Sequence, residues 1–139
     1  MLKILKPSIR VFAVQARVNS ALAAAFEAGG PRWIDWRDTI VEGASTPLIT
    51  DEMYPLLSQL VDELVLVGED EVMAAISLLS WGNKLVTGGA GAAATAAALA
   101  TSAEARGLSV CVVSGGSVDR ALFASVVGKS GRVPIGSLA

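Results

Sequence analysis

The 139-residue sequence contains no histidine and only one cysteine, Cys111. Without histidine, the Ser-His-Asp and Cys-His arrangements of nucleophilic catalysis and most zinc sites are excluded. A single cysteine cannot form an internal disulfide, and its place in an apolar run indicates a small buried side chain. The chain is therefore suited to a reducing compartment, and we expect it to be cytoplasmic.

Charge of either sign is also sparse. Lys and Arg number 11 against 13 Asp and Glu, which gives a formal net charge of -2, and the basic residues form no cluster. A nucleic-acid-binding or membrane-surface protein would carry such a cluster. Residues 1–10 lack the apolar core of a signal peptide. The uncharged stretch 85–103 is mostly alanine and glycine and is interrupted by threonines, so it favours a tightly packed interior helix over a membrane span. We therefore expect no nucleic-acid partner and no membrane partner.

What the sequence has in abundance is apolar side chains, at 53% of residues, enough for one domain with a sizeable core. Short β-branched runs predict strands at 9–14, 64–67, 84–87 and 110–113. Helical patterns alternate with them, at 19–28, 51–61, 69–81, 92–106 and 119–127. This alternation predicts an α/β fold with a mainly parallel twisted sheet and helices on both faces. We expect residues 1–127 to form the domain and residues 128–139 to form a loose tail.

The segment LSVCVVSGGS, residues 108–117, contains the first candidate site. Its apolar run 110–113 predicts a strand buried on both faces, and it is followed by Ser114, Gly115 and Gly116. In open α/β sheets, ligands lie beyond the carboxyl ends of strands, and paired glycines let the backbone approach a flat ligand. This pattern favours Ser114 as a ligand-binding residue.

The same residues have a purely structural interpretation. Ser117 is a good helix N-cap, and a helix is predicted to start near Asp119. On this interpretation the serines and glycines form only a turn between a strand and a helix. The residues alone leave both interpretations open.

A second glycine turn, residues 88–91, connects the strand predicted at 84–87 to the following helix. Its exposed N–H groups and the positive end of the helix suit a ligand with negative charge or an electron-rich ring substituent. Residues 89–94 also match a dinucleotide-binding fingerprint, which would make the chain a nucleotide-binding α/β domain. The short preceding strand and the lack of an acidic residue after the next strand weigh against that alternative.

Three blocks of sequence together resemble a known family. They are DEMYPLLSQLVDELVLVGEDEV, KLVTGGAGAAATAAAL and LSVCVVSGGSVD. They resemble the carboxyl-terminal part of the catalytic domain of threonine and serine dehydratases, which are fold type II, or tryptophan synthase β-like, pyridoxal phosphate enzymes. The order and spacing of the blocks agree over about residues 7–127. The resemblance implies a lyase of amino-acid metabolism that converts serine or threonine into a 2-oxo acid and ammonia.

The resemblance also implies which positions face the cofactor, pyridoxal phosphate. Ser114 matches the family's serine that hydrogen-bonds the pyridine nitrogen, and a neutral hydroxyl there leaves that nitrogen unprotonated. Gly43 matches a glycine whose backbone lies near the ring. The complete set of implied cofactor-binding residues is Ser114, Gly115, Gly116, Gly43, Gly89 and Ala90.

The departures from the family pattern are equally informative. The family's Schiff-base lysine and its glycine-rich phosphate loop have no counterpart in this sequence, and Gly88 replaces the usual glutamate beside the cofactor. Gln15 and Ala21 stand where cation-binding members have acidic residues, so we expect no metal site. We therefore expect a truncated dehydratase-like protein that is inactive alone and has lost most of its phosphate binding.

Two further expectations concern partners. A truncated sheet would have open edges and an uncovered face, which favours a homo-oligomer or a complex with a complementing chain. The alternative to a truncated enzyme is then a non-catalytic α/β module that acts by self-association. If the chain is active, its substrate is a small amino acid.

Overall fold

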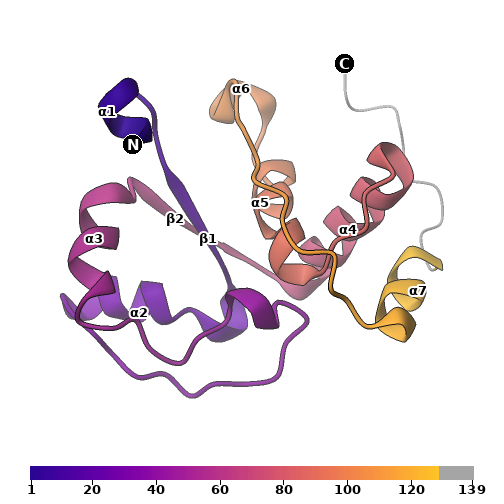
Figure 1. The fold of residues 1–139 in the computed structure, drawn as a ribbon, viewed down its shortest axis with the longest axis horizontal. Coiled ribbons are helices and arrows are strands. Elements are labelled where there is room, and N and C mark those ends of the chain that lie inside the picture. Colours follow the sequence, from indigo (N-terminus) through magenta and orange to yellow (C-terminus); the bar gives the residue numbers. More distant parts are fainter. Residues whose placement is uncertain (129–139) are drawn as a thin grey trace. The chain divides into compact units, whose positions relative to one another are not determined.

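The computed structural model describes residues 1–128, and the chain divides into two compact units, Met1–Gly68 and Glu69–Ala139 (Figure 1). The tail predicted at 128–139 lies, beyond Gly128, outside the described residues. Among the described helices, none is long and apolar enough to cross a membrane.

The first unit contains a parallel pair of strands. Strand β1, Phe12–Ala16, pairs with β2, Glu63–Val67, in a register that runs from Phe12 opposite Glu63 to Ala16 opposite Val67. The strands are about as long as predicted, and their parallel direction confirms that prediction. The helical elements of this unit are α1 (Leu2–Leu5), η1 (Arg17–Asn19), α2 (Ala21–Ala28), η2 (Glu42–Ala44) and α3 (Met53–Leu60).

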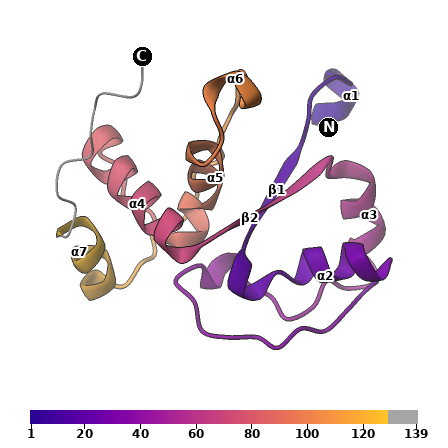
Figure 2. The same cartoon turned by 180° about the vertical axis from the view of Figure 1, so that it is seen from behind.

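The core of the first unit lies between the strands and the helices α2 and α3, which both lie on one side of the strand pair (Figures 1 and 2). Its buried members come from α2 and from Ile49 in the loop before α3, and strand residues such as Leu64 pack against them. The rings of Phe26 and Tyr54 meet edge to face, with their centroids 6.3 Å apart. Apolar burial of this kind is the main force holding helix to sheet.

Two buried amide side chains fix the path of the chain after β1. The Gln15 carbonyl oxygen accepts a hydrogen bond of 2.9 Å from the Leu22 N–H, which lies in the first turn of α2. The fully buried Asn19 donates to the Arg37 carbonyl at 2.6 Å and accepts from the Arg37 N–H at 3.0 Å. Such bonds replace the water lost on burial, so both amides are structural parts of the unit.

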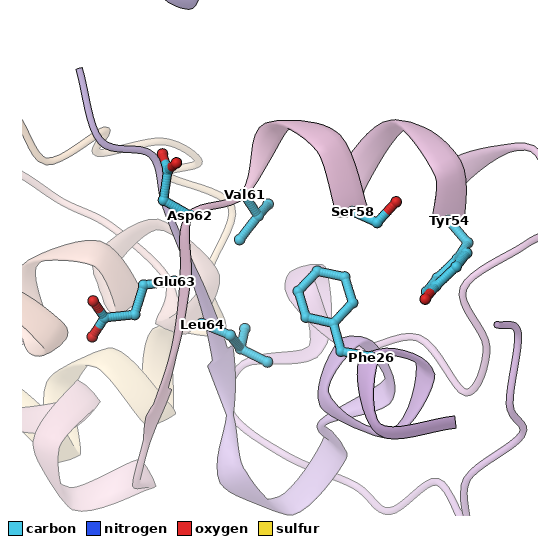
Figure 3. Close-up of a pocket in the computed structure, with 7 residues that line it drawn as sticks. All are labelled: Phe26, Tyr54, Ser58, Val61, Asp62, Glu63 and Leu64. Atoms are coloured by element: carbon cyan, nitrogen blue, oxygen red, sulfur yellow. The ribbon is translucent and has the colours of Figure 1, made fainter. Parts of the chain in front are cut away.

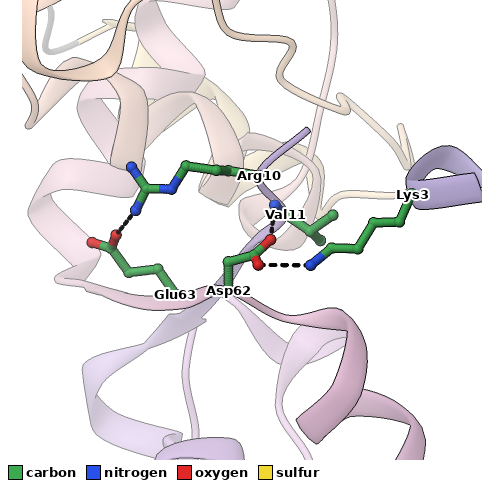
Figure 4. Close-up of polar contacts among 5 residues, drawn as sticks. All are labelled: Lys3, Arg10, Val11, Asp62 and Glu63. Carbon is green, nitrogen blue, oxygen red and sulfur yellow. Dashed lines mark hydrogen bonds and ion pairs between the residues drawn. The ribbon is translucent and has the colours of Figure 1, made fainter. Parts of the chain in front are cut away.

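An ion pair ties the amino terminus to the start of β2. Lys3 and Asp62 are 2.6 Å apart, and the second Asp62 oxygen accepts a 2.7 Å hydrogen bond from the Val11 N–H (Figure 4). Beside them, Arg10 and Glu63 form a second, exposed pair at 2.6 Å. The bonds from Lys3 and Val11 lower the pKa of Asp62 below its ordinary value of 3.8. Both bonds favour the ionised carboxylate.

The second unit is built from helices. In it, α4 (Glu69–Asn83) packs against α5 (Gly89–Leu99) and against α7 (Arg120–Gly128), and the short α6 is Ala103–Arg106. The buried face of α5 consists of glycines and alanines, which allow a close approach. Two side chains of α4 reach α7, because the Ser77 hydroxyl donates to the Val126 carbonyl at 3.3 Å and the Trp81 indole to the Val127 carbonyl at 3.2 Å.

Two of the predicted strands are wrong. Residues 84–87 and 110–113 belong to no strand, and Val110 and Val112, expected to be buried, are 90% and 74% exposed. A strand forms only where a neighbouring strand pairs with it, and the described residues provide none for 110–113. The helix predicted at 92–106 is also interrupted, because Ser102 starts α6 by accepting a 3.3 Å hydrogen bond from the Ala105 N–H.

The ion pair predicts how stability depends on pH. Because the pKa of Asp62 is lowered in the folded chain, its stabilising contribution is present above the ordinary value of 3.8 and is lost as pH falls through the lowered value. We expect Asp62→Asn to be less stable than the parent at pH 7 and to lose less stability on acidification. Urea unfolding followed by circular dichroism at pH 7 and at pH 3 measures both effects.

The matched control is Glu27→Gln at the exposed end of α2. Between pH 7 and pH 3, this variant should lose as much free energy of unfolding as the parent loses. If Asp62→Asn and the parent lost equal stability on acidification, the role given to Asp62 would be wrong.

Candidate functional site

Within the second unit, the two glycine turns lie against each other. The Gly88 N–H, just before α5, donates a 3.1 Å hydrogen bond to the Gly115 carbonyl. The single O–H of Thr87 donates a hydrogen bond that is shared between the Ser114 carbonyl oxygen, at 3.0 Å, and the Gly88 carbonyl oxygen, at 3.1 Å. Turns far apart in the sequence are therefore joined by backbone contacts.

Gly91 makes this close approach possible. A Cβ atom on Gly91 would overlap the Ser114 carbonyl and the Thr87 hydroxyl, so only glycine fits at the first turn of α5. Thr87 is 1% exposed, and it satisfies the carbonyl that faces the helix. The sequence analysis included Gly91 only as part of the turn 88–91 and gave Thr87 no role, although both belong to the KLVTGGAG block.

Five of the six residues predicted to face the cofactor meet at this junction. Gly89 and Ala90 are the first two residues of α5, where helix N–H groups have no partner within the helix and the helix end is partially positive. The opposite turn is formed by Ser114, Gly115 and Gly116, and all three are exposed. Exposed glycines beside a helix start form a surface that a flat ligand can approach closely.

The glycines of the second turn have specific conformational roles. Gly115 has a φ of 61°, in the left-handed region that favours glycine. A Cβ on Gly116 would lie 3.3 Å from the Val86 carbonyl oxygen, which is a tight contact. Next to them, the Ser114 side chain is exposed, and no hydrogen bond of its hydroxyl to another described residue is present.

The sixth residue, Gly43, lies in the other unit. It is the central residue of η2, and it is exposed. Its relation to the glycine turns of the second unit stays a prediction.

Ser117 is not the N-cap proposed in the structural interpretation of the serine turn. Helix α7 starts at Arg120, and the Asp119 carboxylate accepts a 2.8 Å hydrogen bond from the Leu122 N–H. Asp119 therefore caps the helix, because its side chain reaches the third residue of the first turn. Helix capping therefore does not explain the serines of the turn 114–117.

A hollow of about 340 Å³ lies in the first unit, and none of the predicted site residues lines it (Figure 3). Phe26 from α2 lines it, as do Tyr54 and Ser58 of α3. Asp62 and Glu63 point away from the Phe26 ring, and their carboxylates are paired with Lys3 and Arg10. The hollow thus presents no free charge to a ligand.

The family is decided by comparison with known sequences. The sequence profile described as "Pyridoxal-phosphate dependent enzyme" matches residues 1–116. The chain belongs to this family. The resemblance to its dehydratase members is therefore confirmed.

Similar curated proteins are threonine-degrading enzymes. The catabolic L-threonine dehydratase TdcB of Escherichia coli is 32% identical over 130 residues, which are 91% of this chain and 40% of that protein. The L-threonine ammonia-lyase of Thermotoga maritima is 30% identical over 129 residues, which are 92% of this chain and 32% of that protein. The chain thus spans at most about 40% of the length of these relatives.

Solved structures show the same fold. Maize serine racemase superimposes with a TM-score of 0.77 at 27% identity, over 91% of this chain and 41% of that chain. Threonine deaminase isoform 2 from Solanum lycopersicum gives a TM-score of 0.81 over 94% of this chain and 39% of that chain. Its identity of 21% shows the fold alone. The fold is α/β, and it corresponds to part of the fold type II pyridoxal phosphate enzymes.

The Gly91 contact predicts opposite signs for two glycine substitutions. Alanine at Gly91 must displace the Ser114 backbone, so we expect Gly91→Ala to lower the free energy of unfolding by about 1–3 kcal/mol or more. Gly82→Ala in α4 is the control, because its Cβ would meet only Leu78 at 3.9 Å, and it should raise stability by about 0.5–1 kcal/mol. Urea unfolding measures both values, and stabilisation by Gly91→Ala would contradict the close approach.

The buried hydroxyl of Thr87 predicts different losses of stability for two threonine-to-valine substitutions. Thr87→Val keeps the shape but leaves the Ser114 carbonyl without its donor, so we expect a loss of about 1–3 kcal/mol. Thr101→Val removes a comparable 3.1 Å bond to the Ala97 carbonyl at an exposed position, where the loss should stay within about 0.5 kcal/mol. Equal losses in the two variants, measured by urea unfolding, would remove the special role of Thr87.

Proposed function

We propose that these 139 residues form one wall of a pyridoxal phosphate site in a threonine- or serine-dehydratase-like ammonia-lyase. In this proposal the Ser114 hydroxyl faces the pyridine nitrogen. Gly115, Gly116, Gly89 and Ala90 border the ring, and Gly43 is included on the family resemblance alone. The observation that carries the proposal is the junction of Gly88 with Gly115, because it places two Cβ-free turns and a serine hydroxyl together.

The residues of the junction fit the group that the family binds. A planar ring needs flat backbone surfaces, which glycines provide, and a ring nitrogen needs a hydrogen-bond donor, which the exposed Ser114 hydroxyl provides. The start of α5 adds partially positive N–H groups beside Gly89. When bound, pyridoxal phosphate supplies an electron sink for proton abstraction and β-elimination.

The role of this chain is to orient and tune the ring. A neutral serine hydroxyl donates a hydrogen bond without giving up a proton, so the pyridine nitrogen stays uncharged and the ring is a moderate electron sink. The Ser114 backbone cannot shift toward α5, since its carbonyl already occupies the space beside Gly91. The hydroxyl is therefore held on a fixed part of the backbone.

The 139 residues alone should not catalyse the reaction. None of their lysines stands in the family's Ser-x-Lys setting; these are Lys3, Lys6, Lys84 and Lys129. Nothing in the sequence corresponds to the phosphate loop either. We infer that both come from polypeptide outside these residues and that the substrate is a small β-hydroxy amino acid, as the names of the relatives suggest.

The proposal is tested by combining the chain with the missing parts. We would co-express the 139 residues with the part of the E. coli threonine dehydratase outside the 130 matched residues. The complex should bind pyridoxal phosphate, which gives a visible absorption band, and should release a 2-oxo acid from threonine or serine. The 139 residues alone should do neither.

Ser114→Ala tests the role of the hydroxyl in that complex. Loss of the hydrogen bond to the ring nitrogen should lower kcat by about 10- to 100-fold and shift the absorption band of the bound cofactor. Ser109→Ala is the control, because its hydroxyl bonds only to the nearby carbonyls of Arg106 and Gly107. It should change neither quantity.

Two results would contradict the proposal. One is an unchanged cofactor spectrum in Ser114→Ala. The other is specific labelling of one lysine of the 139 residues alone, at about one cofactor per chain, after borohydride reduction and mass spectrometry. The second result would show that the chain contains its own nucleophile.

A further inference from the structure

Two consecutive carbonyl groups of the serine turn are held by two consecutive residues of the glycine turn. The Ser114 carbonyl accepts a hydrogen bond from the Thr87 hydroxyl at 3.0 Å, and the Gly115 carbonyl accepts one from the Gly88 N–H at 3.1 Å. Only the first of these bonds depends on a side chain. Thr87 is therefore the residue through which a substitution can release the turn.

The turn that contains Ser114 provides little restraint of its own. Ser114 is followed by Gly115 and Gly116, and Gly115 has a φ of 61°. Glycine has the widest range of backbone conformations, so two glycines in succession let the peptide plane before them rotate at low cost. The direction of the Ser114 side chain is therefore set by contacts from outside the turn.

The residues around the start of α5 restrain the Ser114 peptide from two sides. Its carbonyl fills the space beside Gly91, so the helix blocks movement toward it. The hydrogen bond from Thr87 resists movement away. Because Thr87 is 1% exposed and β-branched, its side chain has little rotational freedom and is shielded from water. A steric block and a tether thus fix this peptide.

We propose that Thr87 is a positioning residue, whose buried hydroxyl sets the direction of the exposed Ser114 hydroxyl toward the ring nitrogen of bound pyridoxal phosphate. This inference rests on the proposed function. Thr87 is buried and Ser114 is exposed, so Thr87 acts through Ser114 and not by touching the ligand. Hydrogen bonds weaken steeply as their angle departs from linear, so a rotated Ser114 peptide would weaken the bond to the ring.

A purely structural role for Thr87 predicts a different result. In both roles, removing the hydroxyl leaves a buried carbonyl without its donor and lowers stability. Unfolding measurements alone therefore do not separate the two roles. The absorption band of the bound cofactor does, because only a positioning role changes the hydrogen bond to the ring nitrogen in molecules that stay folded.

The test uses the complex of the 139 residues with the E. coli part defined above, loaded with pyridoxal phosphate. Thr87→Val removes the hydroxyl, so we expect the absorption band to shift in the same direction as in Ser114→Ala and kcat to fall by about tenfold. Thr87→Ser keeps the hydroxyl and should restore both toward the parent values. Thr101→Val is the matched control, because it removes an exposed hydroxyl bonded to the Ala97 carbonyl, and it should change neither.

A double substitution shows whether Thr87 acts through Ser114. In a Ser114→Ala background the hydroxyl to be positioned is absent, so adding Thr87→Val should cause no further band shift. It should still lower the urea midpoint of the isolated 139 residues, because the carbonyl of residue 114 loses its donor in either background. Equal band shifts from Thr87→Val in both backgrounds would overturn the proposal.

Thr87→Cys keeps the test decisive if Thr87→Val does not fold. A thiol is a weaker donor than a hydroxyl, so its band should lie between those of the parent and Ser114→Ala. The proposal is overturned by a parent band in folded Thr87→Val or, in its place, in Thr87→Cys. It is also overturned if Thr87→Ser shifts the band as far as Ser114→Ala does.

The outcomes separate this inference from the proposed function. If Ser114→Ala leaves the band unchanged, the proposed function is contradicted, and the role of Thr87 falls with it. If Ser114→Ala shifts the band while Thr87→Val leaves it unchanged, only the role of Thr87 is overturned.

Discussion

The contact of the Ser114 carbonyl with the start of α5 is the constraint on which the candidate site depends. It requires glycine at position 91, because any side chain would occupy the space of the carbonyl. It also requires a donor for that carbonyl, which is the buried Thr87 hydroxyl. The absence of a side chain at Gly91 and the hydrogen bonds from Thr87 and from the Gly88 N–H thus join two turns that α5 and α6 separate in the sequence.

In the first unit, buried amide side chains hold the irregular segment after α2 in place. Asn19 bonds both backbone groups of Arg37, so a buried amide fixes the irregular segment that leads toward Gly43. Gln15 bonds the first turn of α2. At this position the cation-binding relatives implied by the resemblance have an acidic residue. Here the Gln15 side chain is already engaged in a hydrogen bond within the fold.

Local patterns in the sequence predicted the helices and the parallel strand pair well. Acidic residues at the start of α4 are a local signal, and α4 lies close to where it was expected. Small residues predicted the helix α5 as well, but it starts at Gly89 and already ends at Leu99. The strands at 84–87 and 110–113 failed, because a β-branched run shows only that a segment can pair. Whether Val110 and Val112 become buried depends on a neighbouring strand, and residues 1–128 provide none beside them.

The same distinction applies to the site. Glycine turns and the serine were visible in the sequence, whereas the need for Gly91 and Thr87 arises from a backbone carbonyl twenty and more positions away. No propensity scale contains that information. The family resemblance proposed which residues face the cofactor, and the geometry gave the reason why their neighbours Gly91 and Thr87 cannot vary.

The parallel pairing of β1 with β2 has a consequence for how the chain is made. Two parallel strands cannot be connected by a short hairpin. Residues 12–16 therefore have no strand to pair with until residues 63–67 have been synthesised. During translation, β1 leaves the ribosome long before β2 is synthesised. Its edge stays unpaired throughout that interval, so β1 can form its sheet only after residue 67 has been synthesised.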